Sequence, residues 1–178
     1  MEIRFLTEAD AQEYSSIRLE ALESDPDAFG SSAEEHALLT INEIAARVGE
    51  SRHNFVAGAF EGSQLIGTAG FFRSKNIKEH HKGNIWGVYV NQDFRGHGIA
   101  RAMLRTIIDR VATLEEIEQI GLAVATTQTA AVKLYRSLGF ETYGYEKHAL
   151  KIGPRYIDEE HMVLWLRPSA GSLRVLTK

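Results

Sequence analysis

The spacing of hydrophobic positions divides the chain into seven strand-like and four helix-like segments. The first helix begins after a hydroxyl cap at Thr7, and acidic residues occupy its first turn, as is typical of a helix start. The predicted helices span residues 7–23, 40–49, 96–114 and 129–138. The predicted strands span residues 2–6, 54–60, 65–72, 84–90, 117–124, 140–146 and 157–166. Residues 24–32 are predicted to be a loop, because Pro26 and Gly30 interrupt regular structure.

The order of these elements predicts the fold class. A strand, the longest helix and another strand follow one another over residues 84–124, which implies a right-handed crossover between parallel strands. Hairpins on either side imply antiparallel pairs. We therefore expect an α/β (α+β) fold with one mixed, mostly antiparallel sheet flanked by helices, in the order β-α-α-β-β-β-α-β-α-β-β. Residues 2–166 are predicted to form this single domain, residues 167–178 a basic tail, and the apolar run 117–124 a central strand covered on both faces.

Composition excludes several classes of protein. The 178 residues are 44% hydrophobic and 25% charged, as in ordinary globular proteins. The chain has no cysteine, which excludes a disulfide, a thiolate metal site and a cysteinyl intermediate. A formal charge of −4 disfavours a nucleic-acid partner. The first residues lack the pattern of a signal peptide, and no apolar run reaches the roughly 18 residues of a membrane span, so we expect a cytoplasmic protein without membrane contact.

The most informative segment is residues 88–100, VYVNQDFRGHGIA, where a predicted strand ends and the longest helix begins. The N-terminus of a helix presents unpaired N–H groups and the positive end of its dipole, which together favour an anion. Gly96 and Gly98 allow the backbone to approach a phosphate closely, and Arg95 adds positive charge, so a pyrophosphate is the expected ligand. A tight turn without a ligand is the alternative. The patterns G-x-x-x-x-G-K-[ST] and G-x-G-x-x-G do not fit, the latter because its sixth position is Arg101.

The chain resembles the GNAT superfamily of acyl-CoA-dependent N-acyltransferases. Residues 95–100, RGHGIA, match its acyl-CoA-binding pattern [QR]-x-x-G-x-[GA], and residues 131–140, AVKLYRSLGF, resemble its A-x-x-L-Y-x-x-x-G-F block. The predicted order of elements also matches the family fold over about residues 2–166. The resemblance implies an acyltransferase that transfers an acetyl group from acetyl-CoA to a small-molecule or peptide amine, directly within a ternary complex. The resemblance is also compatible with a homodimer, but it does not determine the oligomeric state.

The resemblance also assigns roles to individual residues. Residues 88–90 would bind the pantetheine arm through backbone hydrogen bonds, and the backbone of residues 95–100 would surround the pyrophosphate. Gln128 stands where many members have an asparagine that contacts the cofactor. Tyr135 would be the general acid for the departing thiolate, although its helix face also fits a core position. The expected cofactor site therefore comprises Val88, Tyr89, Val90, Arg95, Gly96, His97, Gly98, Ile99, Ala100 and Gln128, with Tyr135 as the catalytic residue.

The acceptor side of the site is less determined. Many relatives have a glutamate on the strand equivalent to residues 84–90, but this chain has no acid there, so the general base is unassigned. Glu34 and Glu35 are candidates to attract an ammonium group or are a solvated helix start, and the acidic net charge favours a cationic acceptor. The pair His80–His81 and the run 159–161, Glu-Glu-His, are candidates for a metal or base site. The two histidines lack a third ligand at useful spacing, and His161 fits the polar face of a strand, so we expect no metal. A non-catalytic acyl-CoA sensor is the alternative function.

Overall fold

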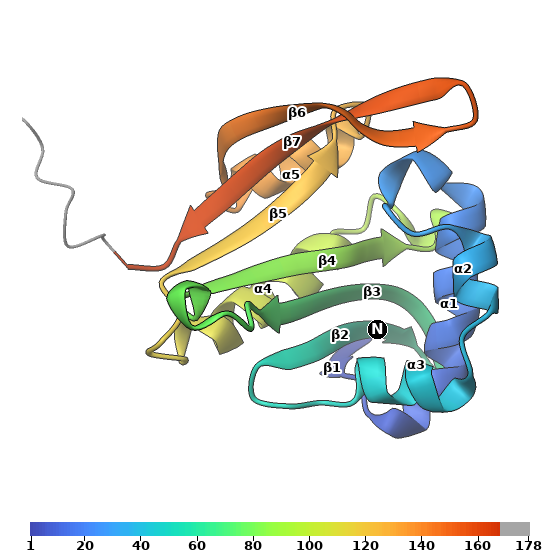
Figure 1. The fold of residues 1–178 in the computed structure, drawn as a ribbon. Coiled ribbons are helices and arrows are strands. Elements are labelled where there is room, and N and C mark those ends of the chain that lie inside the picture. Colours follow the sequence, from blue (N-terminus) through green and yellow to red (C-terminus); the bar gives the residue numbers. More distant parts are fainter. Residues whose placement is uncertain (168–178) are drawn as a thin grey trace, which may run out of the picture.

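The computed structural model describes residues 1–167, which form one seven-stranded sheet with helices on both faces (Figure 1). The strand order is β1-β2-β3-β4-β5-β7-β6, and the pair β4·β5 is parallel while the other neighbours are antiparallel. The strands are β1 (Glu2–Phe5), β2 (Asn54–Glu61), β3 (Gln64–Arg73), β4 (Lys82–Val90), β5 (Gln119–Ala125), β6 (Glu141–Ile152) and β7 (Arg155–Trp165). The helices are α1 (Ala11–Ser24), α2 (Ala33–Ala37), α3 (Ile41–Val48), α4 (Ile99–Ala112) and α5 (Thr129–Ser137). The predicted fold class is confirmed.

Alternation along the strands supplies a core on each face of the sheet. On β2, Phe55 and Ala57 point into the cluster that buries Met103 and Ile107 of α4. Val56, between them, points into the other cluster with residues of α1 and α3. Helices α4 and α5 therefore cover one face, while α1 to α3 cover the other face only over β2 to β4, as Figure 1 shows.

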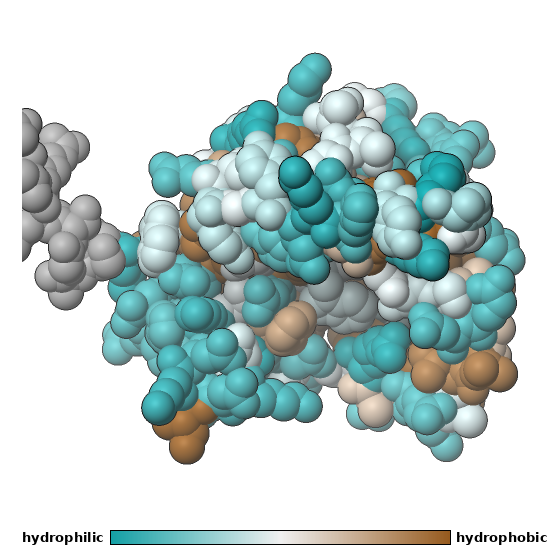
Figure 2. All heavy atoms as spheres, turned by 45° about the horizontal axis from the view of Figure 1, so that its top comes forward, coloured by the Kyte–Doolittle hydropathy of each residue, from teal (hydrophilic) through white to brown (hydrophobic). Residues whose placement is uncertain are grey.

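The parallel pair β4·β5 is short, and this opens the sheet. Its register covers Lys82 to Asn84 opposite Gln119 to Gly121, after which the two strands separate. Strand β4 also carries a bulge, because Gly87 and Val88 both stand opposite one residue of β3, and Gly87 has a φ of +61°. The rest of β4 thus has no strand partner on its β5 side, and Figure 2 shows a hollow between the part that carries β6 and β7 and the part below it.

The prediction that residues 117–124 are covered on both faces is wrong. Leu122 and Val124 of β5 are buried against the α4 and α5 side, but Ala123 is exposed. The reason is the splay of the sheet, since α1 to α3 end over β4 and leave the second face of β5 open. The run lacks alternation because Gly121 and Ala123 are small rather than because they are covered.

Other differences concern element ends. The helix predicted over residues 96–114 begins at Ile99, because Gly96 and Gly98 have positive φ angles and form the turn before it. A short helix, α2, was not predicted, and β6 extends to Ile152, past an irregular pairing near His148 that breaks the alternation. Within residues 1–167, no helix combines the length and the hydropathy of a membrane span. The predicted basic tail lies outside the described residues except for Arg167, and the domain boundaries stay a prediction.

Candidate active site

The turn before α4 presents a row of free backbone donors. Within the described part of the chain, the N–H groups of residues 96–101 donate to no protein group, and intrahelical bonding begins with Ala102 N–H to the Gly98 carbonyl, at 3.0 Å. Gly96 and Gly98 have φ angles of +83° and +78°, which L side chains rarely adopt, and a Cβ on either would meet no protein atom within 4 Å. The turn therefore needs glycine for its backbone shape and leaves open space above the free N–H groups, as an anion site requires.

The side chain of Arg95 is bound to the protein. Its Nε donates to the Val90 carbonyl at 2.9 Å, and its guanidinium forms an ion pair with Asp25 at 2.6 Å. Its own N–H donates to the Gln92 carbonyl at 3.2 Å. The expected hydrogen bonds from Arg95 to a pyrophosphate are therefore replaced here by internal ones, and Arg95 fixes the loop between β4 and α4.

The unpaired part of β4 leads from this loop toward the middle of the sheet. Residues 85–90 have neighbours on β3 but none on β5. Free N–H and C=O groups along a strand edge accept an extended ligand as if it were another strand. The expected role of Val88 and Val90 fits this edge, although the Val90 carbonyl already accepts from Arg95.

The free N–H groups and the free edge of β4 meet in one cavity of about 400 Å³. Ten of the eleven predicted site residues line it: Val88, Tyr89, Val90, Arg95, Gly96, Gly98, Ile99, Ala100, Gln128 and Tyr135. His97 is the exception, because it is exposed and its Nδ1 lies 3.3 Å from the Phe94 carbonyl oxygen. Asp25 and Phe29, from the loop after α1, also line the cavity and were not predicted.

Tyr135 lies in the last turn of α5, and its ring is part of the hydrophobic core. The side chain is 6% exposed and packs edge-on against Phe140, with ring centroids 6.0 Å apart. Burial raises the pKa of its hydroxyl, so the proton stays on the oxygen at neutral pH. The hydroxyl has no hydrogen-bond partner among residues 1–167. Tyr135 is therefore a core residue that also lines the cavity, and its role as a general acid stays a prediction.

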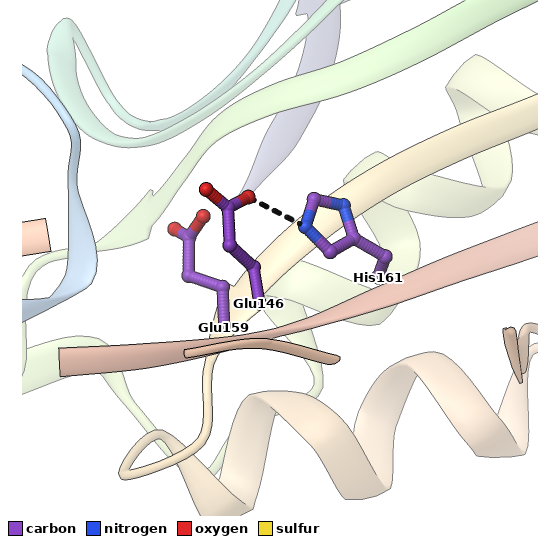
Figure 3. Close-up of side chains that lie close together, drawn as sticks. All are labelled: Glu146, Glu159 and His161. Carbon is purple, nitrogen blue, oxygen red and sulfur yellow. Dashed lines mark hydrogen bonds and ion pairs between the residues drawn. The ribbon is translucent and has the colours of Figure 1, made fainter. Parts of the chain in front are cut away.

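A cluster of ionisable side chains lies on the open face of β6 and β7. Glu146, Glu159 and His161 have their ligand atoms within 4.8 Å of one another, and His161 Nε2 lies 3.1 Å from a carboxylate oxygen of Glu146, within hydrogen-bond distance (Figure 3). Their neighbours Glu160 and Met162 point the opposite way, toward α5 and the core. Burial raises the pKa of Glu159, Glu146 raises it further, and His161 lowers it. The sequence analysis considered Glu159 and His161 but did not anticipate Glu146 beside them.

The acidic residues expected near the acceptor lie elsewhere. Glu35 forms a reciprocal cap with Ser32 at the start of α2, with hydrogen bonds of 2.9 and 3.1 Å. Glu34 is exposed one position before it. Neither residue lines the cavity, so their pattern reflects a helix start.

Comparison with known proteins agrees with this geometry. The family model described as "Acetyltransferase (GNAT) family" matches residues 15–140, more than half of the chain. The chain belongs to the GNAT family. Among curated proteins it is 28% identical over 151 residues to N-alpha-acetyltransferase RimI of Mycobacterium tuberculosis, covering 83% of this chain and 82% of that protein. It is 31% identical over 78 residues to L-amino acid N-acetyltransferase AaaT of Escherichia coli, covering 43% and 48% of the two chains.

Solved structures of GNAT proteins share the fold. An acetyltransferase from Streptococcus pneumoniae superposes with a TM-score of 0.83 at 21% identity, covering 92% of this chain and 98% of that one. A phosphinothricin acetyltransferase from Sinorhizobium meliloti, solved in complex with acetyl-CoA, has a TM-score of 0.76 at 21% identity, covering 96% and 94%. Membership of the GNAT family confirms the predictions of an acetyltransferase and of acetyl-CoA as its co-substrate. The roles of individual residues stay predictions.

Proposed function

We propose that this GNAT protein transfers the acetyl group of acetyl-CoA to a primary amine by direct attack within a ternary complex. The observation that carries the proposal is the single cavity onto which the free N–H groups of residues 96–101, the unpaired edge of β4 and the Tyr135 side chain all open. An anion, an extended amide chain and a leaving group that needs a proton are the three parts of acetyl-CoA that these features fit.

The donor site is mostly backbone. The pyrophosphate accepts from the N–H groups at the start of α4, where the helix dipole adds about 0.3–1 kcal/mol per charge. The pantetheine arm extends along β4, and the bulge at Gly87 turns the strand where the thioester ends. Gln128 lines the same cavity beside α5, so its amide is available to the cofactor.

In the transfer step the amine nitrogen attacks the thioester carbonyl, the C–N bond forms and the C–S bond breaks. The departing thiolate takes the proton of Tyr135, which burial keeps protonated beforehand. No cysteine exists in the chain to hold the acetyl group, which is consistent with direct transfer. The nitrogen of the new amide releases its extra proton to water, and Tyr135 regains a proton through that water, which leaves a neutral amide and the CoA thiol.

The attacking amine must first lose a proton, at a cost of roughly 4–5 kcal/mol for an alkylammonium at neutral pH. We assign this proton to Glu159, directly or through water. Its carboxylate lies on the open face of β7, opposite the helix side, and its raised pKa makes it a better base than an ordinary carboxylate. Ala123 of β5, which is exposed on the same face, has a side chain too short to obstruct it.

The test is release of free CoA from acetyl-CoA across a broad amine panel, with acetyl-CoA binding measured separately by calorimetry. Amine-dependent CoA release together with the N-acetylated product supports the proposal. Binding of acetyl-CoA without release for any amine would contradict catalysis and favour an acyl-CoA sensor. Absence of binding would contradict the donor site itself.

A further inference from the structure

A second cavity of about 850 Å³ lies on the face of the sheet that α1 and α3 cover. Its lining includes Arg18 of α1, Arg47 of α3, and Trp86 of β4. None of these residues lines the cavity of about 400 Å³ that is proposed to bind acetyl-CoA, which we call the donor cavity. Two of them carry buried donor atoms without any partner, and these atoms indicate what the cavity binds.

Arg18 is buried without a counter-charge. The residue is 6% exposed, its Nη1 is fully buried, and within residues 1–167 its guanidinium forms no hydrogen bond or ion pair. Its guanidinium carbon lies 4.4 Å from the centroid of the Phe29 ring, in a cation–π contact. A buried charge without a hydrogen-bonded partner is strongly unfavourable, so this arrangement is expected only where a ligand completes it.

Trp86 supplies a second orphan donor in the same cavity. Its Nε1 is buried and has no partner among the described residues. The indole lies flat against Gly70 of β3, where any Cβ would overlap the ring, so the side chain is fixed in place. Arg18 and Trp86 thus both present N–H donors, and no acceptor, to one space.

The unpartnered N–H groups of Arg18 and Trp86 lie next to the place where the thioester of acetyl-CoA is proposed to end. Gly87 follows Trp86 in β4, and a Cβ built on Gly87 would lie 3.8 Å from the Arg18 Nη1. Val88, the next residue, lines the donor cavity. Phe29 joins the two spaces, because it lines the donor cavity and packs on Arg18. A molecule bound at Arg18 is therefore next to the reacting end of acetyl-CoA.

The surroundings are positively charged. Arg47 and Lys75 line the cavity and form no ion pair within residues 1–167, whereas Glu43 is the one acid on its lining and accepts hydrogen bonds from Thr40. Burial, Arg18 and Arg47 together lower the pKa of nearby His36. A polyamine or another polycation would be repelled from this space, in contrast to the cationic acceptor that the net charge favours.

We propose that Arg18 and Trp86 bind a carboxylate of the acceptor, which makes the substrate an amino-carboxylic acid. The carboxylate satisfies both orphan donors and neutralises Arg18, while the amine of the same molecule faces the thioester beside Gly87 and Val88. This inference rests on the proposed acetyl transfer, and it names the substrate class of that same site.

The experiment compares amino acids with their α-carboxamides as acceptors, by CoA release at saturating acetyl-CoA. The carboxamide removes the negative charge and keeps the amine. It also lowers the amine pKa, so more of the carboxamide is free base, and a preference for the carboxylate cannot arise from amine ionisation. We expect the wild type to prefer carboxylates by about 10- to 100-fold in kcat/KM.

Two variants test the contributions of the two hydrogen-bond donors, Arg18 and Trp86, one at a time. Arg18→Met should remove the preference by lowering kcat/KM for the carboxylates and leaving that for the carboxamides within about 2-fold. Trp86→Phe keeps an aromatic ring, although a smaller one, and removes the N–H, and should lower kcat/KM for the carboxylates about 3- to 10-fold. Arg105→Met, at an exposed position of α4, and Trp165→Phe, at the other tryptophan, are matched controls that should change neither value.

Thermal unfolding gives a readout independent of turnover. Arg18→Met should unfold at the same or a higher temperature than the wild type, because it removes an unpaired buried charge. With CoA present, amino acids should stabilise the wild type and Trp165→Phe but not Arg18→Met. If Arg18→Met fails to fold, the same comparison on Trp86→Phe decides.

The outcomes distinguish this inference from the proposed function. Equal use of carboxylates and carboxamides, preference for polyamines, or a preference that survives in Arg18→Met would overturn the carboxylate site. Carboxylate-dependent stabilisation that is lost in Arg18→Met, without CoA release for any amine, would support the site and contradict acetyl transfer. If the amino acids cause no stabilisation and no amine leads to CoA release, the carboxylate site and the proposed acetyl transfer are both overturned.

Discussion

The Arg95 guanidinium and the Asp25 carboxylate lie 2.6 Å apart and join two loops that are 70 residues apart in sequence. One loop follows α1 and the other precedes α4, and both line the donor cavity. Since Arg95 also donates to the Val90 carbonyl, it connects the end of β4, the loop with the free N–H groups and the loop after α1. We therefore expect Arg95 to contribute to cofactor binding by holding the cavity in shape.

Removing Arg95 or removing Asp25 should weaken acetyl-CoA binding to a similar extent. We expect Arg95→Gln and Asp25→Asn each to raise the KM for acetyl-CoA about 3- to 10-fold with a smaller effect on kcat, because each disorders the same loops. Steady-state kinetics with the double variant should show less than the sum of the two effects. If Arg95 instead binds the pyrophosphate directly, Asp25→Asn will leave KM unchanged or lower it, since it frees the guanidinium.

The Tyr135 hydroxyl should matter for the chemical step alone. Tyr135→Phe keeps the ring that packs on Phe140, so acetyl-CoA affinity by calorimetry should stay within about 2-fold. Loss of the proton donor should lower kcat about 10²- to 10⁴-fold. Tyr143→Phe, at a tyrosine that is 69% exposed, is the control and should behave as wild type. Unchanged turnover in Tyr135→Phe would remove this hydroxyl from the mechanism.

Gly98 shapes the turn before α4 and is also expected to bind the cofactor, and a pair of alanine variants separates these two roles. Gly98 and Gly62 both have positive φ and open space around a Cβ, so Gly98→Ala and Gly62→Ala should each destabilise the protein by about 1 kcal/mol. Only Gly98→Ala should also raise the KM for acetyl-CoA, because its methyl group enters the space above the free N–H groups. Equal KM values in the two variants would indicate that Gly98 is needed for the turn and not for the ligand.

The assigned base predicts a particular pH dependence. The pKa of Glu159 lies above its ordinary value through burial and through Glu146, and the base acts when deprotonated, so kcat/KM should fall on the acid side at a pH above the usual carboxylate range. Glu159→Gln should lower kcat/KM about 10²-fold and abolish this acid limb. Glu146→Gln removes a nearby negative charge and should move the limb to lower pH without abolishing it. An acid limb unchanged in Glu159→Gln would assign the base elsewhere.

The sequence was informative where function depends on the backbone. The glycines at 96 and 98, the strand before them and the helix after them predict the free N–H groups directly, because local chemistry determines that turn. Arg18 also left a signal, since it follows Ile17 on a helix face of buried positions where an arginine is unexpected. Its meaning depended on Trp86 and Gly87, which lie near it only through the packing of α1 on β4.

Other features had no local signal. The ion pair of Arg95 with Asp25 forms between distant loops, and the charge pattern of either loop alone indicates only a solvated turn. The open face of β5 follows from the separation of β4 and β5 after three paired residues, which hydrophobic spacing does not record. The same separation leaves Glu159 on an open face of the sheet. Only the three-dimensional structure therefore distinguishes Glu159 as the candidate base.

Asp10 makes the stability of the fold depend on pH. The hydrogen bonds from Arg4, at 2.9 and 2.5 Å, and from Thr7 lower the pKa of Asp10 to about 2 from an ordinary value of 3.8. A carboxyl whose pKa is lower in the folded state stabilises the protein above the unfolded value and loses this effect as the pH falls toward 2. With Arg4 partly exposed, the contribution at neutral pH is about 1–2 kcal/mol.

Asp10→Asn should therefore lower the free energy of unfolding in urea by about 1–2 kcal/mol at pH 7, and by roughly half as much at pH 3, where part of the wild-type contribution is already lost. Asp109→Asn, at an exposed position of α4, should show no such pH-dependent difference from wild type. Because Asp10 lies remote from the donor cavity, acetyl-CoA affinity should be the same in all three proteins. A stability difference that is independent of pH between 3 and 7 would show that the asparagine acts through packing or hydrogen-bond geometry and not through the ion pair with Arg4.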